Sequence, residues 1–292
     1  PFCDEFIISA NAEHENIIKN QMKAFQGVTY RCIFEEKRIR TAPAILFASM
    51  EVSKSEIILA VPADNLITGT YKYRDDILKG KEYAKKGYQT IYGFEPENYD
   101  KRYGYMTVRN GTVNKFKEKP KQSEISEYIK NENCLVSGGI FIFQAGRILK
   151  EYRETAEEFY LKCEKAYKNR KVKGNAVYYS KKTLKEIPAV SIEKTLFEKS
   201  GNLKAIKAGF DWKDINSLDD LHHTNFENKE NSRFLNYDTD DISLINLQKD
   251  KVIAANGIKG LTIINTDDVL YIGKTGNSDN LKQIVAENNK KT

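Results

Sequence analysis

The chain has 292 residues, with 47 Lys and Arg against 41 Asp and Glu, and a net charge of +6 over a composition that is 40% hydrophobic and 30% charged. This balance is that of an ordinary globular protein and argues against disorder as the main state. The longest apolar runs, residues 57–63 and 138–143, are far shorter than the roughly 20 residues of a membrane-spanning helix, so we expect no membrane span. Basic and acidic residues are interleaved almost everywhere, which argues against nucleic-acid binding.

Strand-like and helical segments alternate along the first 225 residues. Short β-branched or aromatic runs predict strands over residues 6–9, 57–61, 90–94 and 139–143. Two helices are predicted between them, over residues 13–25 and 71–86. Each carries an apolar stripe that we interpret as a core face, formed by Ile18, Met22 and Phe25 in the first helix and by Tyr73, Ile77 and Ala84 in the second. The alternation predicts an α/β fold, Rossmann-like, with a mostly parallel sheet and helices on both faces.

After about residue 225 the sequence becomes polar and turn-rich, and short β-like runs replace the helices. These runs cover residues 242–247, 252–255, 261–265 and 269–272, and a helix over residues 280–289 closes the chain. We therefore expect two domains, residues 1–225 and residues 226–292. The second is predicted to be a small, β-helix-like all-β domain.

The four cysteines and three histidines exclude several kinds of site. The cysteines lie far apart without a Cys-x-x-Cys pair, which is typical of reduced thiols in a cytoplasmic protein rather than of a disulfide framework or zinc site. His14 lies in an early helix, and His222 and His223 are adjacent, so a Ser-His-Asp triad has no support. Neither a Walker P-loop nor a Gly-x-Gly-x-x-Gly motif occurs.

Two acidic residues follow strand-like runs, where ligands bind in α/β sheets. Asp64 comes after the run 57–61 and Pro62, although a turn-forming Asp is an equal alternative. Asp214 comes shortly after the run 203–208, although it is also placed to cap a helix beginning near residue 217. Two carboxylates at neighbouring strand ends would hold one Mg²⁺, which prefers oxygen ligands and keeps positions for phosphates. Sequence spacing alone does not bring the two acids together.

A charged hairpin supplies a second set of candidates. Residues 116–120 (Phe-Lys-Glu-Lys-Pro) form one strand, residues 103–105 (Tyr-Gly-Tyr) belong to the other, and the Asn-Gly pair at 110–111 is the turn signal. Glu118 is suited to hydrogen bonds with sugar hydroxyls and Lys119 to a phosphate. Charged hairpins are also common on surfaces, so the motif alone is weak.

Taken in order, these segments resemble the mannose-1-phosphate guanylyltransferase family of sugar-nucleotide synthesising enzymes, and the likeness covers nearly the whole chain. It is carried by residues 41–44 (TAPA), 61–64 (VPAD), 103–105 (YGY), 116–120 (FKEKP), 139–141 (GIF), 191–193 (SIE), 198–199 (EK) and 212–214 (WKD). The tail from 252 to 284 is similar to the small β domain that follows the catalytic domain in this family.

The resemblance implies transfer of GMP from GTP to mannose 1-phosphate, giving GDP-mannose and pyrophosphate. It implies that Asp64 and Asp214 coordinate Mg²⁺, and that Glu35 and Thr41 lie in the segment that faces guanine. It also places around the sugar and its phosphate the residues Gly104, Glu118, Lys119, Gly139, Glu193 and Lys199, of which the two lysines are expected to act in catalysis. Such a transfer depends on positioning and charge neutralisation more than on a general base, because the attacking phosphate is already ionised.

The chain also departs from the family pattern. The pair at 39–40 is Ile-Arg instead of Arg-Asn, Ser137 replaces an Asn, Glu193 an Asp, and Asn216 a Gly. These departures leave the exact nucleotide and sugar open. A nucleotidyltransferase for another sugar 1-phosphate is therefore one alternative, and a non-catalytic homologue that binds sugar phosphate or nucleotide, or has a regulatory role, is another.

The family's first strand leads into a glycine-rich loop with an Arg and a Lys that hold the triphosphate. The chain begins at Pro1 without an initiator Met or a secretory signal, and we expect it to begin after that loop. The sheet would then lack a central strand and expose unpaired edges. The sequence leaves open whether the chain alone is active and whether it forms a homo-oligomer.

Overall fold

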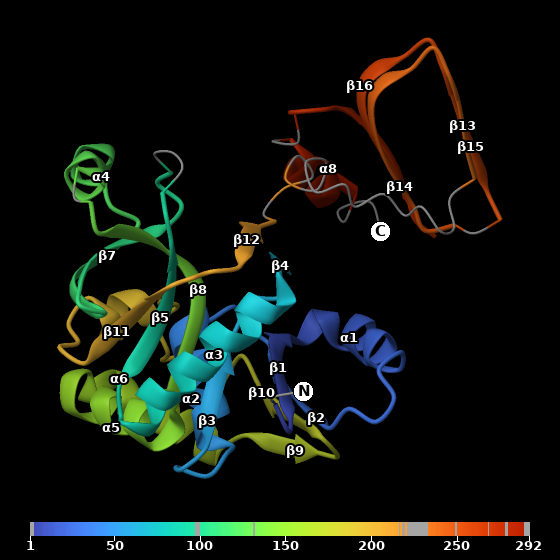
Figure 1. The fold of residues 1–292 in the computed structure, drawn as a ribbon. Helices are drawn as coiled ribbons and strands as arrows, with labels where there is room; N and C mark the ends of the chain where they lie inside the picture. The colour runs from blue at the N-terminus through green and yellow to red at the C-terminus, as the bar shows by residue number, and fades with distance from the viewer. Residues whose placement is uncertain are drawn as a thin grey trace. The chain divides into compact units, whose positions relative to one another are not determined.

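The computed structural model describes residues 3–96, 100–130, 132–215, 217, 220, 233–248, 250–267, 269–277 and 280–288. The chain divides into two compact units, drawn in Figure 1. The first comprises Pro1–Ala63 and Ile67–Trp212, and the second comprises Asp64–Leu66 and Lys213–Thr292. The expected domain boundary at 225/226 lies outside the described residues, as do His222, His223 and Asn216, and it stays a prediction.

The larger sheet of the first unit has six strands in the order β3-β8-β5-β11-β7-β6. Their bounds are β3 (Ile57–Ala60), β5 (Gln89–Phe94), β6 (Gly104–Arg109), β7 (Thr112–Glu118), β8 (Cys134–Gln144) and β11 (Leu203–Lys207). The predicted strands at 57–61, 90–94 and 139–143 are confirmed as β3, β5 and part of β8. β5 and β11 are parallel, whereas β8 is antiparallel to β3, β5 and β6, so this sheet is mixed.

A second sheet in the same unit has the order β1-β2-β10-β9. It contains β1 (Phe6–Asn11), β2 (Tyr30–Glu35), β9 (Lys171–Lys173) and β10 (Ala176–Tyr179), and β1, β2 and β10 are mutually parallel. The predicted strand at 6–9 is β1. Within the described residues β1 pairs only with β2, and β3 pairs only with β8, so each of these strands has one unpaired edge.

Helices cover both faces of the six-stranded sheet, as the sequence predicted (Figure 1). The helices of this unit are α1 (Glu15–Met22), α2 (Thr41–Met50), α3 (Thr70–Lys85), α4 (Gln122–Ile129), α5 (Ala145–Thr155) and α6 (Glu157–Lys168), with the short turns η1 (Ala12–His14) and η2 (Glu193–Phe197). Alternate residues of β8 point to opposite faces. Ile140 packs in the cluster of α3, and Phe141 packs in the cluster of α2 and α5. The sequence and structure therefore agree on an α/β fold.

The two predicted apolar stripes have different outcomes. In α3, Ile77 and Ala84 are buried and Tyr73 packs against them, so this core face is confirmed. In the first predicted helix the prediction is wrong: α1 buries no residue and ends at Met22, and Phe25 beyond it is 59% exposed. Only Ile18 of that stripe packs on the core of the four-stranded sheet.

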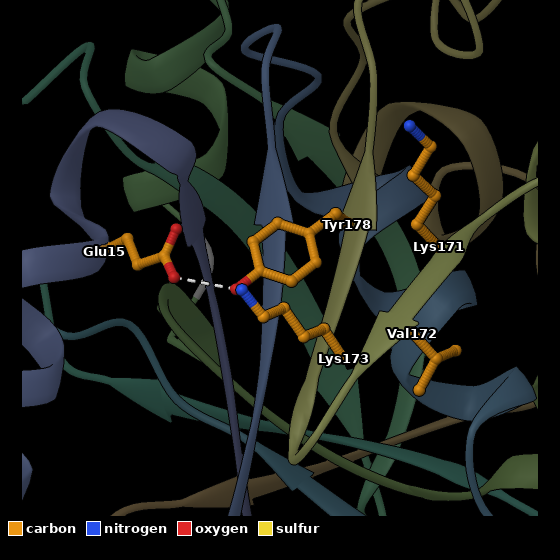
Figure 2. A pocket seen from close by; sticks show the side chains of 5 residues that line it. All are labelled: Glu15, Lys171, Val172, Lys173 and Tyr178. Atoms are coloured by element: carbon orange, nitrogen blue, oxygen red, sulfur yellow. Dashed lines mark hydrogen bonds between the residues drawn. The ribbon is translucent and has the colours of Figure 1, made fainter.

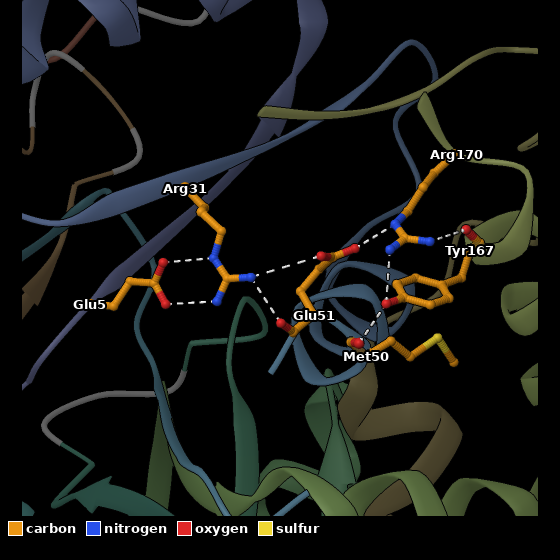
Figure 3. Close-up of polar contacts among 6 residues, drawn as sticks. All are labelled: Glu5, Arg31, Met50, Glu51, Tyr167 and Arg170. Carbon is orange, nitrogen blue, oxygen red and sulfur yellow. Dashed lines mark hydrogen bonds and ion pairs between the residues drawn. The ribbon is translucent and has the colours of Figure 1, made fainter. Parts of the chain in front are cut away.

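A chain of ion pairs ties the four-stranded sheet to α2 and α6 (Figure 3). Arg31 on β2 binds both carboxylate oxygens of Glu5, at 2.6 and 2.7 Å, and donates to the backbone oxygen of Glu51 at 2.9 Å. The Glu51 carboxylate pairs with Arg170 Nε at 2.6 Å, and the Arg170 guanidinium stacks on the ring of Tyr167. Tyr167 in turn donates to the backbone of α2 at 2.7 Å. The network thus fixes the carboxyl end of α2 to two other elements.

The second unit is strand-rich, as predicted. Its elements are β13 (Arg233–Tyr237), β14 (Asp240–Asn246), β15 (Val252–Asn256), β16 (Lys259–Asn265), β17 (Leu270–Lys274) and α8 (Leu281–Asn288). β13 lies parallel to β15, and β14 lies parallel to β16, each partner being 19 residues further along the chain. The buried side chains of Asn246 and Asn265 stack in this register, and an amide hydrogen bond of 2.9 Å joins them. A coil repeated in this way is β-helix-like.

None of the described helices has both the length and the apolar character that a membrane crossing requires.

Candidate functional site

Asp64 and Asp214 lie on neighbouring, hydrogen-bonded segments. Asp64 immediately precedes β4 (Asn65–Thr68), and Asp214 is the last residue of β12 (Asp211–Asp214), the strand that pairs with β4. The backbone N–H of Ile215 donates to the Asp64 carbonyl oxygen at 2.9 Å. Within the described part of the chain no group of three or more His, Cys, Asp or Glu side chains that could hold a metal ion occurs. The predicted shared Mg²⁺ stays a prediction.

Glu118 and Lys119 lie at the carboxyl end of β7. Glu118 faces Gly104 of β6 in the strand register. A Cβ atom on residue 104 would come within 3.0 Å of Glu118 Oε2 and 2.9 Å of the Phe116 ring, so this close approach requires glycine. Lys119 has a φ of 50°, an uncommon conformation for a residue other than glycine, and its N–H donates to the Tyr103 carbonyl at 3.2 Å. The sharp change of direction after Glu118 leaves the Lys119 side chain half exposed, and its ammonium lies 3.9 Å from the Glu118 carboxylate.

Glu193 begins the π-helical turn η2, which packs against the end of β7. The residue is only 9% exposed, and its buried Oε2 atom has no hydrogen-bond partner in the part of the chain that the structure describes. The segment before it is anchored to the first turn of α2, because the Ile192 N–H donates to Thr41 Oγ1 at 3.0 Å. Three elements far apart in the sequence therefore bring together Thr41, Glu118, Lys119 and Glu193.

The two carboxyl groups of this cluster are electrostatically coupled. Burial raises the pKa of the Glu118 carboxyl to about 7; the nearby Glu193 adds to the rise, and Lys119 opposes it. Burial also raises the pKa of Glu193, against the lowering effect of hydrogen bonds from the backbone and from Ser191 and of the Lys119 charge. Perturbed carboxyl groups of this kind are typical of binding and catalytic sites. Both groups are strong acceptors once ionised.

Glu35 lies at a different strand end, the carboxyl end of β2. It is 6% exposed and stands opposite Asn11 of β1 and Tyr179 of β10 in the parallel register. Its carboxylate accepts a hydrogen bond from the Ser9 hydroxyl at 3.3 Å. Burial raises the pKa of the Glu35 carboxyl to about 8. Ser9 is thus a partner of Glu35 that the sequence did not reveal, because the contact depends on the register of β1 and β2.

Gly139 forms a bulge in β8. Between the paired positions 91/141 and 93/137, β8 carries two more residues than β5, and Gly139 there has a φ of 70°. A Cβ atom at this position would lie 3.1 Å from the Pro62 ring. The Ser137 hydroxyl accepts from the Gly139 N–H at 3.3 Å. The bulge therefore brings the backbone of β8 close to the exit of β3.

Lys199, like Gly139, is a predicted residue of the sugar-phosphate set that no described contact joins to the other members. It follows the π-helical turn, its side chain is exposed, and its backbone N–H donates to the Leu196 carbonyl at 3.0 Å. By contrast, Glu198, to which the sequence motifs give no separate role, accepts a hydrogen bond from the Glu118 N–H. A π-helical turn leaves no mark in the residue pattern, so no sequence signal placed Glu198 there.

A shallow cavity of about 680 Å³ lies elsewhere in the first unit, between α1 and the β9–β10 hairpin (Figure 2). It is lined by Glu15, Lys171, Val172, Lys173 and Tyr178. The Tyr178 hydroxyl donates to Glu15 at 2.7 Å. None of these residues is among the predicted site residues, so the cavity does not coincide with the cluster at β7.

An α/β fold that gathers carboxyl groups and a lysine at strand ends is typical of enzymes that bind polar substrates there. The chain belongs to the nucleotidyl transferase family, whose model matches residues 2–231. The family resemblance drawn from the sequence is thereby confirmed.

The chain is also similar to curated relatives and to solved structures. The mannose-1-phosphate guanylyltransferase 2 of Escherichia coli O157:H7 is 24% identical over 305 residues, which cover 97% of this chain and 63% of the relative, so the chain spans about three fifths of that protein. A Thermus thermophilus structure described as a mannose-1-phosphate geranyltransferase has a TM-score of 0.74 at 19% identity. The match covers 97% of this chain and 84% of the Thermus chain. A Helicobacter pylori structure described as a mannose-6-phosphate isomerase has a TM-score of 0.70 at 25% identity. The match covers 72% of this chain and 85% of the Helicobacter chain.

Proposed function

We propose that the protein transfers a nucleotidyl group from a nucleoside triphosphate to a sugar 1-phosphate, and specifically GMP from GTP to mannose 1-phosphate. The observation that carries this proposal is the cluster of Glu118, Glu193 and Lys119, in which the buried Oε2 of Glu193 has no hydrogen-bond partner among the described residues. A buried acceptor without a partner is costly unless a ligand completes its hydrogen bonds. Names of relatives such as the Escherichia coli guanylyltransferase support the choice of GTP and mannose 1-phosphate.

The cluster has the chemistry that a phosphorylated sugar needs. Sugar hydroxyls donate to the two carboxylates, and the Lys119 ammonium pairs with the phosphate. The close packing of Gly104 against Glu118 leaves the carboxylate one narrow set of orientations, which favours a defined hydroxyl pattern. Lys199 is assigned to the phosphate by the family resemblance alone. Glu35 and Thr41 are proposed for the guanine side on the same basis, and Glu35 must lose its proton before it accepts two hydrogen bonds from a guanine edge.

Asp64 and Asp214 are proposed to hold Mg²⁺. The donor set fits, because two carboxylates on adjoining segments supply hard oxygen ligands and leave positions for water and phosphate oxygens. When bound, the ion supplies positive charge to the phosphates. The protein's own contribution is to keep the two acids on paired strands, so that neither has to be brought into place at the moment of binding.

The proposed reaction needs no general base. An ionised oxygen of the sugar phosphate forms a bond to the α-phosphorus of GTP, the bond from that phosphorus to the bridging oxygen of the β-phosphate breaks, and pyrophosphate leaves with the electron pair. Rate then depends on the alignment of the two phosphates and on the charge around them. A site built from lysines and carboxylates, with no histidine among the proposed residues, fits this chemistry.

The test is a pyrophosphate-release assay on the 292-residue chain with a panel of nucleoside triphosphates, each combined with mannose, glucose and galactose 1-phosphates. We expect release with GTP and mannose 1-phosphate, and none without the sugar. Release with another combination of nucleoside triphosphate and sugar 1-phosphate would replace GTP and mannose 1-phosphate as the substrates but keep the proposed nucleotidyl transfer. Calorimetry with each ligand alone separates the alternatives further: binding of sugar phosphate without any turnover indicates a binding or regulatory protein, and no binding of either ligand overturns the proposal.

The four cysteines are free thiols, which fits a reducing compartment, and we infer a cytoplasmic protein.

A further inference from the structure

The carboxylate of Glu198 holds the end of β7 in an unusual way. Glu198 Oε1 accepts a hydrogen bond from the backbone N–H of Glu118 at 2.9 Å, although 80 residues separate the two positions. The same oxygen lies 3.9 Å from the Lys117 ammonium. Glu198 is therefore bound to the chain on both sides of the Lys117–Glu118 peptide bond.

The strand geometry explains why Glu118 needs such a partner. The N–H of Lys119, just after β7, donates to the carbonyl of Tyr103, just before β6, and successive N–H groups of an extended chain point to opposite edges. The Glu118 N–H therefore points away from β6. On that side β7 pairs with β11 only at Thr112, six residues earlier. Without Glu198 this N–H would have no strand to bond to.

The π-helical turn brings Glu198 to this place. The Glu198 N–H donates to the Glu193 carbonyl at 2.9 Å, which is the bond between residues five apart that defines such a turn. In an α-helix, side chains five positions apart would point about 140° away from each other. In the wider turn this angle is smaller, and Glu198 and Glu193 both reach the end of β7. π-helical turns occur frequently at functional sites.

We propose that Glu198 is a positioning residue for the sugar-phosphate site. By accepting the hydrogen bond of the Glu118 amide, it fixes the backbone where Glu118 and Lys119 turn toward the ligand. The identity of the ligand in this inference rests on the proposed function. The positioning geometry rests only on the hydrogen bond between Glu198 and the Glu118 amide. Glu198 does not touch the substrate. By fixing the backbone at Glu118, it sets the direction of the Glu118 carboxylate and of Lys119, whose backbone lies in the left-handed region.

Three variants test the inference. Glu198→Ala removes the acceptor, whereas Glu198→Gln keeps an acceptor oxygen and loses the charge. Glu164→Ala is the matched control, because the Glu164 side chain is 25% exposed against 22% for Glu198 and, among the described residues, pairs with Arg153, Tyr160 and Lys168. Chemical denaturation of each variant identifies those that remain folded.

Two measurements are made on the folded variants. Hydrogen exchange at the Glu118 amide, in the free protein, is expected to be roughly tenfold faster in Glu198→Ala and near normal in Glu198→Gln and Glu164→Ala. Calorimetry with mannose 1-phosphate is expected to give a Kd raised roughly tenfold in Glu198→Ala and restored to within about threefold by Gln. If Glu198→Ala does not fold, the same two measurements on Glu198→Gln and on Glu198→Asp, whose shorter side chain withdraws the acceptor, replace it.

The outcomes distinguish the two proposals. Unchanged exchange at the Glu118 amide in Glu198→Ala overturns the positioning role, and so does faster exchange with unchanged affinity for the sugar phosphate. If the wild-type chain binds no sugar phosphate, the proposed function falls with the inference, while the exchange data still report whether Glu198 holds the strand. Faster exchange and weaker binding, both rescued by Gln, support the inference.

Discussion

The N–H of Ile215 donates to the carbonyl oxygen of Asp64 at 2.9 Å, so the chain on which Asp214 lies is hydrogen-bonded to Asp64 itself. The two segments, far apart in the sequence, are therefore held together by a backbone hydrogen bond that needs no ligand. Backbone pairing of this kind limits how far the two carboxylates can separate.

We expect Asp64→Asn and Asp214→Asn each to weaken binding of Mn²⁺, used as a paramagnetic substitute for Mg²⁺, by at least about tenfold, because each removes one charged oxygen ligand. Electron paramagnetic resonance of free Mn²⁺ measures the affinity. Asp211→Asn is the control, since Asp211 on the same strand instead accepts from the Thr68 hydroxyl. Equal affinities in all three variants would remove the metal assignment.

Gly104→Ala tests the packing of the proposed sugar site. The new methyl group would press on the Phe116 ring and the Glu118 carboxylate, so we expect a stability loss of about 1–2 kcal/mol and a Kd for mannose 1-phosphate raised about tenfold. Gly201→Ala provides the comparison, because no atom lies within 4 Å of a Cβ atom there. Normal sugar-phosphate affinity in folded Gly104→Ala would show that the position of Glu118 does not matter for binding.

Glu35 is expected to make stability depend on pH. The unfolded carboxyl loses its proton near pH 4.5 and the folded one near pH 8, so the folded state binds more protons between these values and stability falls as the pH rises through this window. Glu35→Gln keeps an acceptor for Ser9 and removes the titration. Relative to wild type, we expect the variant to be about 1–3 kcal/mol more stable at pH 9 and unchanged at pH 4.

Urea denaturation at the two pH values measures this difference. The exposed Glu127→Gln serves as the control and should show no such pH-dependent gain. A Glu35→Gln variant whose advantage is the same at pH 4 and pH 9 would contradict the buried, protonated state of Glu35.

Glu51→Gln tests the ion-pair network of Figure 3. The Glu51 side chain is only 10% exposed, and its loss of charge leaves the Arg170 guanidinium without its closest carboxylate. We expect a destabilisation of about 2–4 kcal/mol in chemical denaturation. Glu158→Gln, which removes an exposed pair with Lys162, should change stability by less than about 0.5 kcal/mol. Similar losses in both variants would mean that burial does not strengthen the network.

Sequence patterns predicted the elements that carry a clear apolar run or an apolar stripe. The strands at Ile57 and Thr90 and the stripe of Ile77 and Ala84 fall where the pattern placed them, because each buries its apolar side in the six-stranded sheet. Phe25 fails for a physical reason. Its helix covers the smaller sheet, where Ile18 already supplies the contact, and the chain ends the helix before Phe25 is reached.

The site divides in a similar way. The charged hairpin drew attention to Glu118, the family resemblance implied Glu193, and in the structure each carboxyl group lies close enough to influence the other electrostatically. Motif spacing gave no reason to connect Glu198 with the amide of Glu118, because that contact depends on a turn with one extra residue between its hydrogen-bonded ends. Nor did it reveal Ser9, since a serine in a strand reads as an ordinary surface residue until the register sets it beside Glu35.

Three of the four thiols are shut away from solvent on three separate elements: Cys32 on β2, Cys134 at the start of β8 and Cys163 on α6. Burial raises the pKa of Cys134 to about 11 and that of Cys163 to about 12, so neither is a reactive thiolate in the folded chain. An alkylating reagent at neutral pH will therefore label each cysteine only when its own element opens. The rate of labelling at each position therefore reports how often that part of the protein opens locally, and no engineered probe is needed.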